Sequence, residues 1–244
     1  MEWEILDTGV AGADAIMRKD AELLDSLSSR SMPILHFYQW QRDSATYGYF
    51  VQPDEFLDLE KVKECGLDLA KRPTGGGIVF HAWDLAFSVL VPSNCPLFSM
   101  NSLENYALVN RAVLRAVHTF LKERTDLQLT PVDSPELDSD CRRFCMAKPT
   151  KYDVMLGERK IAGAAQRKQK GGFLHQGTIA LTMPPDAYLN NILIPGTRVL
   201  EAMQAHTYPL LGIDASQTEM ERARVHLRQL LRDSMTMHDN TRTA

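Results

Sequence analysis

Three consecutive glycines at residues 75–77 constrain the backbone more strongly than any other part of the sequence. They follow Arg72 and precede a predicted strand at residues 85–91. Because three successive positions lack side chains, a ligand could lie directly against main-chain N–H groups. Arg72 would place a planar cation beside them, suited to a phosphate or carboxylate. A glycine-rich turn between two strands is the alternative, since the spacing matches neither the dinucleotide-binding fingerprint nor the Walker A loop.

A second stretch, residues 151–181, also combines glycines with strand patterns. An alternating segment, a turn at Gly157 and a returning segment predict a β-hairpin, followed by a strand at residues 173–181. Lys160 lies in the returning segment among Ile, Ala and Gly residues. Its ammonium would therefore sit in an apolar setting, and an exposed turn lysine is the alternative.

Together the two stretches resemble the lipoate–protein ligase and octanoyltransferase family, whose catalytic domain is related to that of biotin–protein ligases. The matching motifs are R-P-T-G-G-G-x-V-x-H from Arg72 to His81, R-K-I-A-G-A-A-Q from Arg159 to Gln166, and H-Q-G-T from His175 to Thr178. The resemblance implies an α+β fold with a mixed, largely antiparallel sheet flanked by helices. It also implies a single catalytic domain over residues 1–244, and the amphipathic pattern of residues 215–235 predicts a closing helix there.

The resemblance implies an acyl or acyl-adenylate site at the glycine stretch. Lys160 matches the family lysine of K-[IV]-[AS]-G and would stabilise negative charge on a carbonyl or phosphate oxygen. His81 and His175 would orient substrate, with the satisfaction of backbone groups as the alternative. The implied binding residues are Arg72, Gly75, Gly76, Gly77, Ile78, Val79, Phe80, His81, Gly163, Gln166, His175 and Gly177.

Cys145 distinguishes two mechanisms. In the cysteine-containing branch of the family, a cysteine lies seven residues before the aromatic residue of the next strand, and Cys145 precedes Tyr152 by seven. The resemblance thus implies that the Cys145 thiolate accepts an octanoyl group and passes it to a lysine. An inert loop cysteine is the alternative. No Cys/His pair at zinc-ligand spacing accompanies Cys141, so no metal site is expected.

The sequence also departs from the cysteine-containing branch. The triple glycine resembles the ATP-dependent ligases, Ala82 follows His81 where Asp is expected, and Lys71 stands where many members have a second Arg. The accessory C-terminal domain of larger ligases is not expected, so a ligase of this length would depend on a partner protein for adenylation.

The predicted function is attachment of an octanoyl or lipoyl group to the lysine of lipoyl domains. These partners are the lipoyl domains of 2-oxoacid dehydrogenases and the glycine cleavage H protein. Transfer from octanoyl-acyl carrier protein through Cys145 is preferred, with no tightly bound cofactor. One alternative is ATP-dependent ligation of lipoate through lipoyl-AMP, using ATP and Mg. The other is a non-catalytic acyl-binding partner subunit.

Composition limits the class of protein and its partners. The hydrophobic share of 44% and charged share of 24% fit a soluble globular chain. No apolar run approaches the roughly 20 residues of a membrane span, and neither a signal peptide nor a disulfide framework is evident, so a cytoplasmic location is expected.

The net charge is −4, yet residues 141–172 hold nine Lys/Arg and two Asp/Glu. This +7 segment predicts a docking patch for an acidic partner, with a solvated mixed-charge surface as the alternative; nucleic acid is disfavoured by the overall acidity.

Periodicity and capping residues predict the remaining elements. Asn101 and Glu104 form a capping-type pair at the start of the clearest helix. Cys65 is expected as a small apolar filler, and the last six residues are expected to fray. Other helices are predicted at residues 11–27 and 57–64 and before residue 193, strands at residues 3–6, 33–40, 45–50 and 127–132, and an irregular loop at residues 133–149.

Overall fold

A seven-stranded sheet forms the centre of the fold, in the order β1-β2-β6-β10-β9-β8-β7. The computed structural model describes residues 1–122, 126–133 and 139–237. β1 and β2 are parallel and the other neighbours are antiparallel, which confirms the predicted mixed, largely antiparallel sheet. The strands are β1 (Glu4–Ala11), β2 (Ile34–Trp40), β6 (Asp84–Pro92), β7 (Leu127–Leu129), β8 (Val154–Leu156), β9 (Arg159–Gln169) and β10 (Gly172–Ala180).

A second, three-stranded sheet carries the glycine stretch. Its order is β4 (Asp68–Lys71), β3 (Ser44–Tyr47) and β5 (Ile78–His81), and the three glycines lie in the loop from β4 to β5. β3 runs parallel to β4 and antiparallel to β5. The periodicity analysis missed β4, because a four-residue strand is too short to show alternation.

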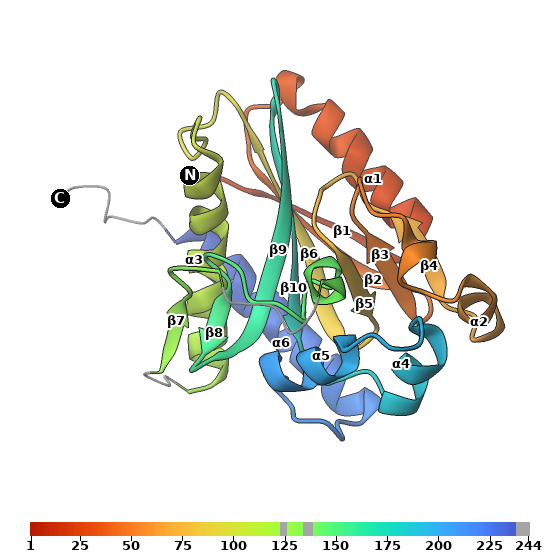
Figure 1. The fold of residues 1–244 in the computed structure, drawn as a ribbon. Helices are drawn as coiled ribbons and strands as arrows, with labels where there is room; N and C mark the ends of the chain where they lie inside the picture. The colour runs from red at the N-terminus through yellow and green to blue at the C-terminus, as the bar shows by residue number, and fades with distance from the viewer. Residues whose placement is uncertain (123–125, 134–138, 238–244) are drawn as a thin grey trace.

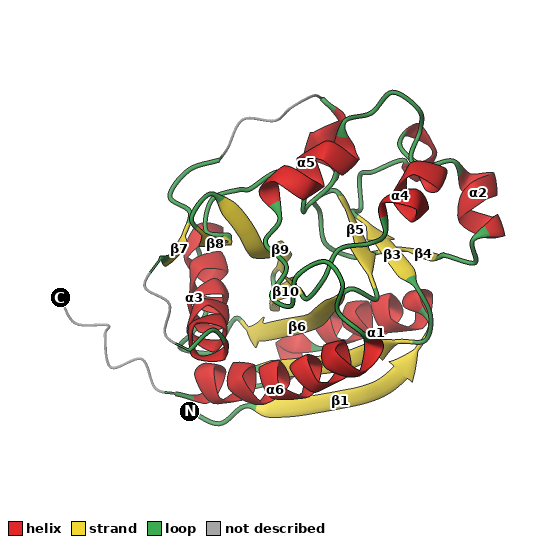
Figure 2. Ribbon diagram, turned by 90° about the horizontal axis from the view of Figure 1, so that it is seen from below, coloured by secondary structure: helices red, strands yellow, loops and turns green. Residues whose placement is uncertain are grey.

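Helices cover both faces of the large sheet (Figure 1 and Figure 2). Phe173 and Ile179 of β10 point into the core formed with α3 and α6, whereas Leu174 packs with residues of α1 on the opposite face. This alternation follows from the two-residue period of a strand. The helices are α1 (Ala13–Asp25), α2 (Leu59–Glu64), α3 (Ser102–Phe120), α4 (Asp186–Ile192), α5 (Val199–His206) and α6 (Gln217–Thr236).

The structure confirms the predicted helices near residues 11–27, 57–64 and 215–235, and the one that begins after Asn101. The Asn101 side chain accepts a hydrogen bond from the Leu103 backbone N–H at 3.0 Å, as a capping residue does. The prediction for Cys65 was wrong: its side chain is exposed, because it follows the last turn of a surface helix. The sequence analysis missed α5, a short helix without a side-chain cap.

Part of the loop predicted at residues 133–149 and the predicted fraying at 239–244 lie outside the described residues, which omit 134–138 and 238–244. The described end of the loop contains a 3-10 turn, Asp140–Arg143. None of the helices in the described ranges is long and apolar enough to cross a membrane.

A β-bulge interrupts the pairing of β8 with β9. Val154 pairs with Ala162 and Met155 pairs with Lys160, so Ile161 is an extra residue on β9. Bulges re-aim the side chains beside them. Ile161 and Ala162 both join the core beside α3, and Lys160 therefore points to the opposite face of the sheet.

His175 of β10 is buried on the α3 face, where its ring lies 5.1 Å from that of Tyr106 between centroids. Within the described ranges neither ring nitrogen has a hydrogen-bond partner. Burial lowers the pKa of His175 to about 3. The imidazole therefore stays neutral in the folded protein at all but strongly acidic pH.

Replacing His175 with Leu is expected to weaken the acid sensitivity of the fold. Between pH 6.5 and 3, the unfolded chain binds a proton at this position that the folded chain does not. The free energy of unfolding of the parent therefore falls as the pH drops below 6.5, by about 1.4 kcal/mol per pH unit from this group. Urea unfolding at pH 7 and pH 5 would show a decline of about 2 kcal/mol from His175 that His175→Leu lacks. The exposed His226 provides the control, since His226→Leu should keep the parent decline; an equal decline in His175→Leu would contradict the prediction.

Candidate active site

A cavity of about 380 Å³, counting its open mouth, lies between the large sheet, the small sheet and α1. It brings together residues from the glycine stretch, the residue 145 loop, β9 and β10, which are far apart in the sequence. Its walls are formed by Met17, Tyr38, Trp40, Thr46, Arg72, Val79, His81, Ala86, Cys145, Gly163, Ala164, Ala165, Gln176, Gly177 and Thr178.

Cys145 is partly exposed in this cavity and is fixed by its backbone. Its N–H donates to the Ile78 carbonyl at 3.0 Å, so the chain around it runs alongside β5. The preceding residue, Phe144, is buried and stacks on Phe80 with 6.0 Å between ring centroids. Val79 faces the cavity, whereas Ile78 and Phe80 pack in the core with Phe144. Core packing on one side thus presents the thiol on the other.

Arg72 is buried, and its guanidinium is held against the thiol. Nη2 donates to the Gly75 carbonyl at 2.7 Å and approaches Cys145 Sγ at 3.7 Å. Nη1 donates to the Thr46 carbonyl at 3.1 Å, and Nε donates to Thr74 Oγ1 at 3.2 Å. A guanidinium in this position stabilises the negative charge that a thiolate carries.

Lys160 is buried beside the same residue. Its Nζ lies 2.7 Å from Asp153 Oδ2 and donates to the Cys145 carbonyl at 2.6 Å. Asp153 also accepts from the Thr150 N–H and hydroxyl, so the buried pair has its hydrogen bonds satisfied. A Cβ at residue 163 would lie 2.4 Å from Nζ, which explains the glycine there. The interpretation of Lys160 as an exposed turn lysine was wrong, because the bulge directs it inward.

The glycine stretch makes room for the protein's own chain. Gly76 has a φ of +80°, and a Cβ there would lie 2.8 Å from Arg72 Nη2 and 3.5 Å from Cys145 Sγ. A Cβ on Gly77 would lie 2.2 Å from the Arg143 carbonyl oxygen. Gly77 therefore packs against the segment that carries Cys145, and Gly76 separates the loop from the thiol.

His81 lines the cavity and is held by a polar cluster. Its ring stacks on Trp40 with 4.3 Å between centroids. Nδ1 lies 2.6 Å from Asp84 Oδ2, and Nε2 lies 3.0 Å from Thr46 Oγ1. Burial alone would raise the pKa of Asp84, yet His81 and a hydrogen bond from Thr178 hold it below its ordinary value. Trp40 and His81 thus form a flat, rigid wall.

Gln166 and His175 are further predicted site residues that lie away from the cavity, as Ile78 and Phe80 do. Gln166 and His175 pair with each other across β9 and β10 and face α3. The Gln166 side chain donates to the Ser102 carbonyl at 3.1 Å, and His175 packs on Tyr106. The structure does not bring either one to the thiol.

The sequence analysis missed the side chains that occupy the cavity side of the same strands. Gly163 pairs with Thr178, and Ala165 pairs with Gln176, so these residues share a face. Alternation along H-Q-G-T could have revealed them. Once Gly163 is placed at the site, its cross-strand partner Thr178 must lie on the same face, and so must Gln176, two residues before Thr178.

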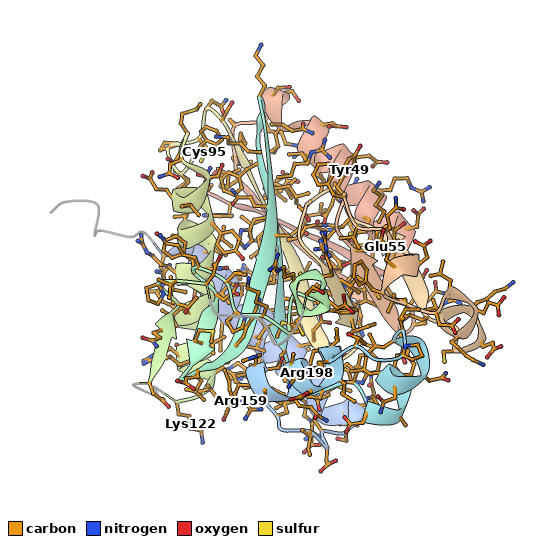
Figure 3. The ribbon with its side chains drawn as sticks, in the orientation of Figure 1. Tyr49, Glu55, Cys95, Lys122, Arg159 and Arg198 are labelled. Atoms are coloured by element: carbon orange, nitrogen blue, oxygen red, sulfur yellow. The ribbon has the colours of Figure 1, made fainter. Side chains whose placement is uncertain are left out.

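Basic and exposed apolar side chains lie beside the glycine loop. Arg167 lies over the Tyr49 ring at 5.4 Å and donates to the Pro73 carbonyl. Phe50, the residue after Tyr49, is 84% exposed. Lys168 is exposed on the α3 side of β9, where its Nζ donates to the Met100 carbonyl. Figure 3 shows Tyr49 on the α1 side of β9 and Cys95, a different free cysteine, on the α3 side. Among the described residues, no cluster of three or more His, Cys, Asp or Glu side chains could hold a metal ion.

Comparison with known proteins identifies the family. The sequence profile described as "Lipoyl protein ligase A/B catalytic domain" matches residues 14–210. A curated relative, "Octanoyltransferase LipM" from Geobacillus kaustophilus, is 31% identical over 204 residues, which are 83% of this chain and 73% of the relative.

Two solved structures share the fold. One is the protein Ta0514 of T. acidophilum with bound lipoic acid, at TM-score 0.70 and 25% identity, covering 98% of this chain and 88% of that one. The other is a lipoate-protein ligase A bound with ATP, also at 0.70 and 25%, covering 96% and 86%. An arginine and a cysteine line one cavity, and a buried lysine donates to the carbonyl of that cysteine. With a profile match over most of the chain, these features show that the chain is an enzyme of the lipoyl protein ligase A/B catalytic-domain family.

Proposed function

We propose that this enzyme transfers an octanoyl group from acyl carrier protein to the lysine of a lipoyl domain through a thioester on Cys145. The observation that carries the proposal is the position of Cys145 Sγ, which opens onto the cavity and lies 3.7 Å from Arg72 Nη2. Curated relatives named octanoyltransferase support the same reaction. The partners are octanoyl-acyl carrier protein as donor and the lipoyl domains of 2-oxoacid dehydrogenases or the glycine cleavage H protein as acceptors.

The reaction proceeds in two exchanges. The Cys145 thiolate attacks the carbonyl carbon of the donor thioester, a new S–C bond forms, and the carrier thiolate leaves and takes up a proton. The acceptor lysine, as a free amine, then attacks the Cys145 thioester, an amide bond forms and the Cys145 thiolate is released. The lysine amine gives up one proton in this step. One thioester replaces another in the first exchange, so no ATP is needed.

The buried cations support this chemistry. Arg72 faces the sulfur and stabilises the thiolate before attack. Lys160 uses two of its three ammonium hydrogens on Asp153 and Cys145, and the third can donate to the oxygen that becomes negative in the tetrahedral intermediate. The apolar walls, including Trp40 and Val79, suit an eight-carbon chain.

An ATP-dependent ligase acting through lipoyl-AMP is the second candidate. The structural relatives bound to ATP and to lipoic acid favour it. Arg72 in the cavity and Lys160 beside Cys145 are the side chains that would meet a phosphate, with ATP and Mg supplying the activation of a free carboxylate. Both cations are already engaged by protein atoms, which favours the transferase. Membership of an enzyme family argues against a non-catalytic subunit.

Cys145→Ala is expected to abolish transfer from octanoyl-acyl carrier protein. Intact-mass analysis of the parent should show one octanoyl adduct, mapped to Cys145 and released by hydroxylamine, because the intermediate is a thioester. The variant should show neither adduct nor turnover. Cys65→Ala, which removes an exposed thiol, and Cys141→Ala, four residues away, should retain both. Full activity of Cys145→Ala with ATP and lipoate, without an adduct in the parent, would establish the ligase instead.

Lys160 is best tested together with Asp153. Lys160→Ala alone would leave a buried carboxylate unpaired and cost about 3–5 kcal/mol of unfolding free energy. The double variant Lys160→Met with Asp153→Asn removes both charges and should keep the fold. Its transfer rate should fall by about 100- to 1,000-fold, as for loss of one oxyanion donor. A folded double variant with the parent rate would assign Lys160 a structural role alone.

Salt should slow transfer, because the basic segment at residues 141–172 attracts acidic carrier and lipoyl domains. Lys168→Glu with Lys170→Glu should reduce the rate at low salt and flatten its salt dependence; Arg167 is left intact because it contacts the glycine loop. Arg222→Glu with Arg232→Glu on α6 reverses two exposed charges elsewhere and should keep the parent profile. The same steep dependence in both pairs would place docking away from Lys168 and Lys170.

A further inference from the structure

A chain of buried side chains connects α1 to the active-site arginine. Gln176 Nε2 donates to Asp20 Oδ2 at 2.6 Å, and Thr74 Oγ1 donates to Gln176 Oε1 at 2.6 Å. Arg72 Nε in turn donates to Thr74 Oγ1 at 3.2 Å. Three hydrogen bonds thus lead from Asp20 to the guanidinium that faces Cys145.

Asp20 is the fixed end of this chain. The carboxylate is fully buried on α1 and accepts from His36 Nδ1 at 2.8 Å and from Ser88 Oγ at 2.6 Å, besides Gln176. His36 is itself held by Thr8 at 2.8 Å. A buried charge requires such partners, and charge-assisted hydrogen bonds are the strong ones. The reaction of Cys145 makes no direct use of this group.

The carboxylate also sets the direction of every hydrogen bond in the chain. An ionised Asp can only accept, so Gln176 must turn its NH₂ group toward it. The Gln176 carbonyl then faces Thr74, whose hydroxyl must donate to it. The lone pairs of that hydroxyl are left for Arg72 Nε.

We infer that Asp20 is a positioning residue that orients Arg72 toward the Cys145 thiol through Gln176 and Thr74. Four segments meet here, because Asp20 lies on α1, Gln176 on β10, Thr74 in the glycine loop and Ser88 on β6. An amide at position 20 has a single acceptor oxygen, for which the His36 N–H competes with Gln176 and Ser88; with that oxygen on His36, the NH₂ group of the amide faces the Gln176 NH₂ group. Gln176 would turn over, Thr74 would lose its acceptor, and the guanidinium would lose one of its fixed contacts.

The inference extends the proposed function but can be measured without it. The rate at which iodoacetamide alkylates Cys145 at pH 7, followed by mass spectrometry of the Cys145 peptide, reports the state of the thiol. The rate of octanoyl adduct formation from octanoyl-acyl carrier protein reports the proposed reaction. If the variants change the alkylation rate as expected but the parent forms no octanoyl adduct, the transferase proposal fails while the positioning role of Asp20 remains supported.

The decisive experiment reverses the polarity of one hydrogen bond. Asp20→Asn should slow alkylation of Cys145 by about 10- to 100-fold, since small misplacement of a site group has effects of that size. Gln176→Glu alone should also be slow, because two carboxylates would face each other. The double variant Asp20→Asn with Gln176→Glu restores a donor at position 20 and an acceptor at 176, while the second Glu oxygen still accepts from Thr74. It should recover most of the parent rate, giving strong coupling in a double-mutant cycle.

Matched controls separate positioning from general damage to the core. Ser88→Ala removes another hydrogen bond from the same Asp20 oxygen without turning Gln176, and should alkylate at the parent rate. Should the Asp20 variants fail to fold, Thr74 decides the question: Thr74→Val should be slow and Thr74→Ser should restore the rate. Parent-like alkylation in folded Asp20→Asn or Thr74→Val, or a double variant no faster than the slower single variant, would overturn the inference.

Discussion

The structure depends on two buried cations whose charges are balanced by hydrogen-bond acceptors from several segments. Arg72 approaches the sulfur of Cys145 and Lys160 donates to its carbonyl, and each cation is nearly inaccessible to solvent. A charge in such a place persists only where acceptors surround it. Thr46 and Gly75 provide them for Arg72, and Asp153 does so for Lys160. The glycine loop, the hairpin and the residue 145 segment must therefore assemble together, because each supplies acceptors or space that another needs.

The sequence was sufficient for the fold class and for the three groups around the thiol. Strong periodicity predicted the long helices, and the motif resemblance pointed to Arg72, Lys160 and Cys145. The structure brings Arg72 and Cys145 to one cavity and Lys160 to the Cys145 carbonyl. The motifs do not show which face of the sheet each residue of β9 and β10 occupies. His175 and Gln166 belong to the motifs but face α3, whereas Gln176 and Thr178 face the cavity. Asp20 gave no signal at all, since an acidic residue within an amphipathic helix usually marks a solvated face. Its burial depends on partners from three other segments.

The departure at Ala82 also has a structural basis. This residue has a φ of 103°, a conformation that side chains larger than glycine rarely adopt. Arg224 of α6 donates to the Ala82 carbonyl at 2.5 Å and to the Asp84 carbonyl at 3.0 Å. Arg224 of the closing helix thus stabilises the turn at Ala82, whose backbone conformation Ala does not favour. This turn directly follows His81, which lines the cavity.

The bulge at Ile161 fixes the direction of the active-site lysine. In a regular antiparallel pair, residues 160 and 162 would point to the same face, and Lys160 would then enter the apolar core beside α3. The same sequence paired in a regular ladder would therefore keep every functional side chain and still carry the ammonium to the wrong side of the sheet. Lys160 and Gly163, three residues apart, share a face only because the bulge lies between them. Grafting this hairpin into another scaffold requires its irregular pairing as much as the identities of its residues.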